Sequence, residues 1–121
     1  MPDGDPRVGE CYMASPETSV NGDAHGQNQR PVAVVERLPR VAVCLGRTTH
    51  PRCDDRKVYS PKNPGLGLSK DGYWTDRNQR MIPSKFWGTD KFRYRGKLPQ
   101  TEVDELAEFW AKTVMLGRRG L

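Results

Sequence analysis

Long apolar runs are missing from this sequence, in which no stretch approaches the roughly 18 residues that a helix needs to cross a bilayer. The first ten residues, MPDGDPRVGE, are acidic and rich in proline, and they have neither the basic start nor the apolar centre of a secretion signal. These absences disfavour membrane insertion and secretion. We therefore expect a cytoplasmic protein that makes no membrane contact.

Cysteine and histidine are scarce. The three cysteines, Cys11, Cys44 and Cys53, are an odd number at wide spacing without a C-x-x-C pair, and only two histidines are present to complete a metal site. We interpret the cysteines as reduced thiols, two of them on strands. Neither zinc nor any other cofactor is expected.

The common enzyme signatures are also absent. The sequence contains no G-x-x-x-x-G-K-[ST], no G-x-G-x-x-G, no G-x-S-x-G and no H-E-x-x-H. The segment PGLGLSKDG at 64–72 places glycines near a lysine, but it lacks the strand-to-helix context of a phosphate loop. We interpret this segment as a turn-rich loop.

Charge is distributed unevenly along a chain whose net charge is +5. Residues 1–36 hold two Lys/Arg against six Asp/Glu, residues 37–70 hold eight against two, and residues 71–121 hold ten against seven. Aromatic residues interleave with the basic ones between Tyr73 and Tyr94, a composition that suits single-stranded nucleic acid because cations contact phosphates and rings stack on bases. Composition alone favours the alternative, in which these aromatics fill the core beneath a solvated basic face.

Hydrophobic periodicity predicts a domain rich in short strands. Alternation predicts a strand at 8–14, and two continuous apolar runs, 31–36 and 41–45, predict a central antiparallel pair buried on both faces. The shorter strands expected beside this pair are 57–59, 72–75, 80–82 and 92–95, with one helical turn at 84–88.

An amphipathic helix is expected after Pro99. Thr101 is the predicted N-cap, with Asp104 completing a capping-box-like pair, and Gly117 ends the helix. The predicted core-facing stripe is Val103, Leu106, Trp110 and Val114, with Ala107 and Phe109 beside it. Together these elements predict one mainly β domain over 1–121: a small SH3-like barrel of five to seven antiparallel strands with a C-terminal α-helix over 8–116, an N-terminal tail at 1–7 and a basic tail at 117–121.

The polar segment 15–29 is long for a connection in so small a domain, which makes it the first place to search for a site. Arg30 stands where this segment meets a buried strand and could bind a phosphate bidentately, or it could cap the sheet edge. Thr48 and Thr49 follow the second apolar run, where their hydroxyls could bind phosphate or satisfy a turn. His25 and His50 lie in the adjoining loops and could carry a proton near neutral pH, or remain idle in solvent.

Several segments occur in an order that can be compared with a known family. They are VGECY at 8–12, GQNQRPVAVV at 26–35, VAVCLGRT at 41–48, LSKDGYW at 68–74 and QRMI at 79–82, followed by the helix over 98–116. This succession resembles the MazF/PemK family of toxin endoribonucleases. The resemblance covers nearly the whole chain from Val8, and its most specific part is the block at 26–35.

The resemblance implies a barrel that dimerises and cleaves single-stranded RNA without metal, through attack of the ribose 2′-OH on the adjacent phosphate. Arg30 falls on the family's catalytic arginine, and Thr48 falls near its catalytic threonine, with Thr49 as the alternative. His25 falls in the loop where some members carry a histidine proposed to move a proton. The residues that we predict to contact RNA are Gln29, Arg47, His50, Arg77, Arg80 and Lys85.

The sequence also departs from the family pattern. When Arg80 is aligned with the arginine of the family's D-Q-x-R signature, Arg77 stands where the family has aspartate, and Thr75 where some members have a second catalytic arginine. A slip of one residue restores Asp76 to the acidic position but breaks the match at Arg80. Two functions follow: an RNA-cleaving toxin that an acidic antitoxin peptide binds, or a barrel without catalysis that binds nucleic acid or protein.

Overall fold

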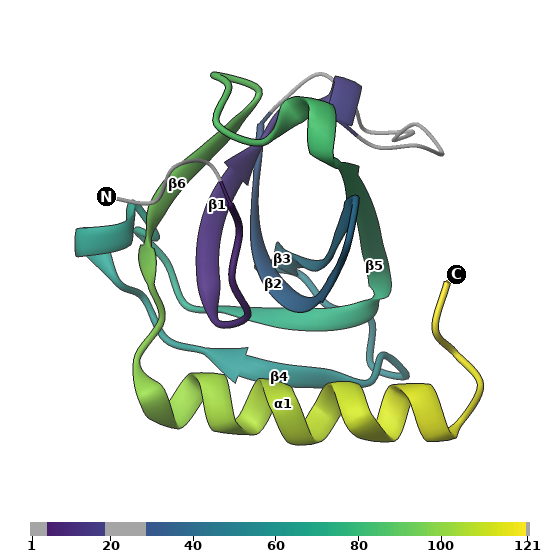
Figure 1. Ribbon diagram of the computed structural model, residues 1–121. Coiled ribbons are helices and arrows are strands. Elements are labelled where there is room, and N and C mark those ends of the chain that lie inside the picture. The colour runs from purple at the N-terminus through teal and green to yellow at the C-terminus, as the bar shows by residue number, and fades with distance from the viewer. Residues whose placement is uncertain (1–4, 19–28, 121) are drawn as a thin grey trace.

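The computed structural model describes residues 5–18 and 29–120, and most of the polar segment 15–29 and part of the predicted N-terminal tail lie outside these ranges. The strands are β1 (Glu10–Ala14), β2 (Arg30–Leu38), β3 (Val41–Thr48), β4 (Lys57–Ser60), β5 (Gly72–Pro83) and β6 (Phe92–Lys97), and the helix is α1 (Gln100–Met115) (Figure 1). All pairings are antiparallel, in the order β4-β5-β3-β2-β1-β6. The predicted mainly β fold with a C-terminal helix is confirmed.

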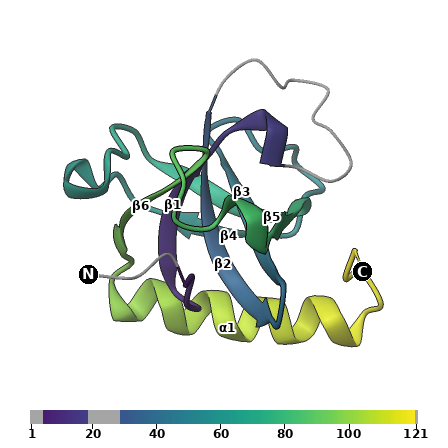
Figure 2. The same cartoon turned by 45° about the horizontal axis from the view of Figure 1, so that its top comes forward.

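The sheet is strongly curled, as Figures 1 and 2 show, and bulges interrupt three of its pairings. Within the described ranges its two edge strands, β4 and β6, do not pair with each other. The segment between β4 and β5 reaches β6 instead, where Arg95 Nε donates to the Leu66 carbonyl over 3.2 Å. A Cβ at Gly96 would lie 2.4 Å from Leu66 Cδ2, so glycine permits this close approach.

The two predicted strand segments at 72–75 and 80–82 form one strand, β5. Its register against β3 shifts between the pairs Leu45↔Gln79 and Arg47↔Trp74, so that four residues of β5, 75–78, lie opposite Gly46 alone. This bulge lets the strand bend without ending. It also breaks the alternation of side chains, which explains why periodicity divided the strand in two.

Side chains of β2 and β3 divide between two cores, as predicted for strands buried on both faces. The first core lies between the sheet and α1 and contains Cys11, Ala33, Val35, Val43, Leu45, Trp74, Leu106 and Trp110. The second lies on the other face and contains Tyr12, Ala14, Val32, Val34, Ala42, Cys44, Ile82 and Phe92. Trp74 and Phe92 are therefore core residues, in agreement with the alternative that composition favoured.

Helix α1 packs beside β4 and contacts β2 and β5 (Figures 1 and 2). The predicted cap at Thr101 is wrong, because Pro99 occupies the N-cap position with φ −54° and ψ 144°, and no side chain caps the helix. Leu106 and Trp110 are buried as predicted, whereas Val114 is 42% exposed and Thr113 is fully buried in its place. Gly117 follows the helix with φ +71°, a conformation that favours glycine at a helix C-terminus.

Cys11 on β1 and Cys44 on β3 are fully buried, which confirms two cysteines on strands, and Cys53 is exposed. Burial raises the pKa of the Cys11 thiol to about 12 and also raises the pKa of Cys44.

We therefore expect an aromatic disulfide reagent to modify Cys53 alone in the native protein at mildly alkaline pH, and all three thiols after unfolding. Cys53→Ser should remove the native reaction; rapid modification of this variant would show that the cores open readily.

Candidate nucleic-acid interface

The sheet register aligns one residue from each strand in a single row. Tyr59 pairs with Tyr73, and Tyr73 pairs with Thr48. Val32 pairs with Gly46, so continuing this register by two residues sets Arg30 opposite Thr48. At the far end, Ala14 pairs with both Arg30 and Phe92.

Cross-strand neighbours point to the same side of a sheet, so the row lies on one face. Ala14 and Phe92 belong to the second core, which identifies this face as the one opposite α1. The row therefore brings Arg30 and Thr48 together, as the sequence predicted, and continues through Tyr73 to Tyr59. Sequence patterns did not indicate that these two tyrosines lie in the same row as Arg30 and Thr48.

Thr48, Thr49 and His50 form a compact turn at the end of β3. The His50 backbone N–H donates to Thr48 Oγ1 over 3.1 Å, and Thr49 Oγ1 lies 2.9 Å from His50 Nδ1. A threonine hydroxyl that accepts a backbone hydrogen bond retains its own hydrogen for a second partner. Thr48 can therefore satisfy the turn and still donate to a phosphate oxygen. His25, the other predicted proton carrier, lies outside the described residues.

Gln29, which immediately precedes β2, is held by a strand at the sheet edge. Arg93 Nη2 on β6 donates to Gln29 Oε1 over 2.7 Å. Both side chains are exposed, and they lie beside the strand end that carries Arg30. Arg93 is absent from the predicted RNA-contacting set. The alternation of basic residues at 93, 95 and 97 was the available signal for an exposed basic edge.

Arg47 occupies a different position from the one that the sequence predicted. Its side chain is only 7% exposed, and its guanidinium donates to Ser60 Oγ at 2.9 Å, the Ser60 carbonyl at 2.8 Å and the Lys70 carbonyl at 2.7 Å. Burial lowers the pKa of Arg47, and the Glu102 carboxylate is the largest influence that opposes this effect. Arg47 thus fastens β3 to the end of β4 and to the segment that follows it, and this geometry assigns Arg47 a structural role rather than contact with RNA.

The other predicted contacts are spread over β5 and the turn after it. Arg77 forms an ion pair with Asp55 over 3.0 Å, and both line a cavity of about 370 Å³. Arg80 is buried opposite Cys44, on the same face as Arg30. Lys85 is exposed, with its ammonium 5.1 Å from the centre of the Phe86 ring. The structure therefore does not gather these three residues into one group around Arg30.

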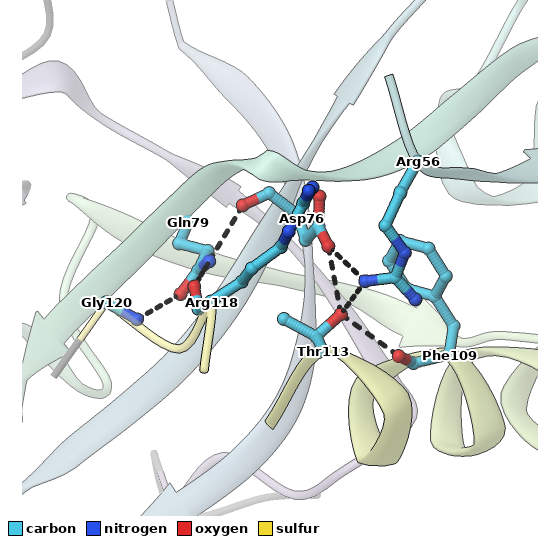
Figure 3. A network of polar contacts seen from close by, with 7 residues as sticks. All are labelled: Arg56, Asp76, Gln79, Phe109, Thr113, Arg118 and Gly120. Atoms are coloured by element: carbon cyan, nitrogen blue, oxygen red, sulfur yellow. Dashed lines mark hydrogen bonds and ion pairs between the residues drawn. The ribbon is translucent and has the colours of Figure 1, made fainter. Parts of the chain in front are cut away.

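Asp76, the acidic residue beside the family-like signature, joins β5 to α1 (Figure 3). Its buried carboxylate accepts hydrogen bonds from Arg56 Nη1 and from Thr113 Oγ1, the latter over 3.0 Å. Arg56 Nη1 also lies 2.8 Å from Thr113 Oγ1, and its guanidinium stacks 4.6 Å from the centre of the Phe109 ring. This network explains how a polar residue, Thr113, takes the core position that Val114 was expected to fill.

The C-terminal segment folds back onto β5 beside this network (Figure 3). Gln79 Nε2 donates to the Asp76 and Arg118 carbonyls, each over 2.7 Å, and the Gly120 N–H donates to Gln79 Oε1 over 2.7 Å. Arg119 pairs with Glu36 of β2. Residues of the predicted basic tail are therefore fastened to the sheet.

Thr113→Val should lower the free energy of unfolding by about 1–3 kcal/mol, because the buried Asp76 carboxylate loses a donor without any change in side-chain shape. Urea denaturation measures this difference. Thr101→Val is the matched control, since Thr101 is exposed on the same helix and caps nothing; its effect should stay within about 0.5 kcal/mol. Equal effects of the two substitutions would contradict the role given to Thr113.

No group of three or more His, Cys, Asp or Glu side chains in residues 5–18 and 29–120 is arranged to hold a metal ion. In the same part of the chain, no helix is long and apolar enough to span a bilayer.

The curled six-stranded antiparallel sheet with a C-terminal helix has the fold of the MazF/PemK toxins, as the sequence resemblance implied. A crystal structure of MazF (Form-I) from Deinococcus radiodurans matches it with a TM-score of 0.63 and 16% sequence identity, covering 93% of this chain and 96% of that chain. At this identity the similarity shows the fold alone. No family model matches the chain, and no curated protein matches it.

Proposed function

We propose that this protein is a metal-independent endoribonuclease that cleaves single-stranded RNA. The observation that carries the proposal is the β2–β3 register, which ends at the pair Val32↔Gly46 and, continued by two residues, sets Arg30 opposite Thr48 on the face opposite α1 of a MazF-type fold. A guanidinium and a hydroxyl on adjacent strands can bind the same phosphate from two sides. The surrounding chain is basic, with a net charge of +5 that attracts RNA.

In the proposed reaction the ribose 2′-oxygen attacks the adjacent phosphorus, and the bond from phosphorus to the 5′-oxygen of the next nucleotide breaks. The 2′-OH gives up its proton and the departing 5′-oxygen receives one, which leaves a 2′,3′-cyclic phosphate and a 5′-OH end. Negative charge grows on the non-bridging oxygens as phosphorus becomes five-coordinate. Arg30 stabilises this charge with its paired N–H groups.

Thr48 donates to a non-bridging oxygen of the same phosphate, and Thr49 is the alternative donor in the turn. His25 is assigned the proton transfer, because the family resemblance implies this role at its position in the sequence before β2. Gln29 and His50 lie beside these residues in the sequence and contact the flanking nucleotides. Lys85, Arg77 and Arg80 contribute positive charge at longer range.

The wider role that we propose is that of the toxin in a toxin–antitoxin pair, acting in the cytoplasm as a homodimer. An acidic antitoxin peptide would bind the face that carries Arg30 and block RNA from reaching this residue. Support comes from the excess of basic residues in 37–70, where eight Lys/Arg stand against two Asp/Glu. Loss of RNA binding on addition of such a peptide would test this part of the proposal.

The cleavage proposal is tested by incubating the purified protein with a long single-stranded RNA in excess EDTA. We expect discrete fragments whose 5′ ends carry hydroxyl groups, and mapping of these ends gives the cleavage position. Intact RNA after incubation with folded protein would contradict the proposal.

A second candidate function is a binding module without catalysis. It is favoured by the use of Asp76 and Arg47 in the fold, since neither is available to complete a catalytic site. This alternative predicts retention of RNA that falls steeply with salt and produces no new RNA ends. Detection of cyclic phosphate ends would exclude it.

A further inference from the structure

Two tyrosines extend the row beyond Thr48 toward the sheet edge. Tyr73 is the direct cross-strand neighbour of Thr48, and Tyr59 is the direct neighbour of Tyr73 on the edge strand β4. Their ring centres lie 5.7 Å apart with an interplanar angle of 58°. Because adjacent strands are about 5 Å apart, Tyr59 lies about 10 Å from the strand that carries Thr48.

Tyr59 does not belong to either hydrophobic core. Its neighbours on β4, Val58 and Ser60, are buried, whereas the Tyr59 side chain is 50% exposed. Desolvation raises the pKa of Tyr59, and the Asp71 carboxylate raises it further. Tyr59 therefore has its ring next to that of Tyr73, while half of its surface remains open.

Lysines flank the two tyrosines in the chain, and Glu102 and Glu105 of α1 line a cavity with Tyr59. Lys57 lies on β4 two residues before Tyr59, and Lys62 and Lys70 flank the segment that joins β4 to β5; all three are exposed. Exposed rings next to a path of cations are the arrangement that binds single-stranded nucleic acid, since the rings stack on bases while the cations contact phosphates.

We propose that Tyr59 and Tyr73 form a stacking platform for a nucleobase next to the scissile phosphate. The inference rests on the proposed function, because it takes the phosphate position from Arg30 and Thr48. When Arg30 and Thr48 hold the scissile phosphate, the RNA strand continues past Thr48 along the row. The next base of the RNA then reaches Tyr73 and Tyr59. Because every base can stack on a tyrosine ring, the platform contributes to the affinity for RNA and to the position of the RNA on the protein more than to the choice of base.

The test measures equilibrium binding of a short RNA that carries a 2′-deoxy sugar at the mapped cleavage position, which prevents the proposed reaction. Tyr59→Ala should weaken binding about 10- to 100-fold, the loss expected for one stacked base. Tyr59→Phe retains the ring and should bind within about 3-fold of wild type. Tyr94→Ala is the matched control, since Tyr94 is 41% exposed on the opposite edge strand; it should also bind within about 3-fold.

A second measurement identifies the stacked base. RNAs that lack one base at a time should show a single position, adjacent to the cleavage site, where loss of the base weakens binding to wild type but not to Tyr59→Ala. Equal affinity of Tyr59→Ala and wild type, with cleavage of unmodified RNA intact, would overturn the platform alone. Failure of wild type to cleave unmodified RNA would overturn the proposed function and this inference with it.

Discussion

Replacing Arg30 by alanine is expected to slow RNA cleavage by about 10²- to 10³-fold, the usual cost of removing one donor that stabilises transition-state charge. Arg30 is the first residue of β2, where its backbone is fixed by pairing to β1 and its side chain is partly exposed. The free energy of unfolding should therefore change by less than about 1 kcal/mol. Cleavage rates in EDTA and urea denaturation curves of the same preparation measure both effects.

Arg40→Ala is the matched control for this experiment. Arg40 lies at the opposite end of the β2–β3 hairpin, in the turn, and its side chain is exposed. It carries the same charge as Arg30, so any effect of net charge on RNA association should be equal in the two variants. If both variants cleave RNA at the wild-type rate, Arg30 has no catalytic role; if both lose activity equally, the loss reflects net charge.

Trp74→Ala is expected to have the largest effect on stability, lowering the free energy of unfolding by about 3–5 kcal/mol. Trp74 is fully buried between the sheet and α1, so truncation leaves a large cavity in the first core. Its indole Nε1 also donates to Glu102 Oε2 over 2.6 Å, and Glu102 is only 6% exposed. The substitution therefore removes packing and leaves a buried carboxylate without this donor.

Urea denaturation followed by circular dichroism measures this loss. Trp74→Phe separates the two contributions, because it keeps most of the ring volume and should cost about 1–3 kcal/mol through the lost hydrogen bond. Val114→Ala serves as the control on α1, where the exposed side chain predicts a change within about 0.5 kcal/mol. A loss below about 1 kcal/mol for Trp74→Ala would show that the first core is not packed as described.

Local patterns were sufficient to predict the central hairpin and the C-terminal helix. The runs at 31–36 and 41–45 are apolar because both faces of β2 and β3 are buried, and continuous apolarity is visible in a short window of sequence. The same reasoning placed Cys11 and Cys44 on strands. The proximity of Arg30 and Thr48 could also be predicted, because a hairpin brings the start of its first strand to the end of its second.

Contacts between distant segments could not be predicted in this way. Thr113 is buried because its hydroxyl meets Asp76 and Arg56, which lie 37 and 57 residues away in the sequence. Arg47 is buried because Ser60 and Lys70 supply carbonyl acceptors from another segment. In both cases a polar residue interrupts an apolar pattern, and the compensating partners become visible only in three dimensions.

The extension of the site to Tyr59 and Tyr73 was missed for a related reason. Its recognition needs the registers of β4 against β5 and of β5 against β3, and the second of these contains a bulge. Sequence spacing does not determine register across a bulge, since one added residue moves side chains to the opposite face. The basic and aromatic composition suggested nucleic acid as a class of ligand, but it could not select which rings are exposed.

The most direct test of the central claim compares two RNA oligonucleotides that differ in a single hydroxyl. One carries the natural ribose at the mapped cleavage position, and the other carries 2′-deoxyribose there; both are incubated with wild-type protein in EDTA. The proposed reaction predicts cleavage of the first, with a 2′,3′-cyclic phosphate on one fragment and a 5′-OH on the other, and no cleavage of the second at that position. Cleavage of both at the same position, or of neither, would contradict the assignment of this protein as a 2′-OH-dependent ribonuclease.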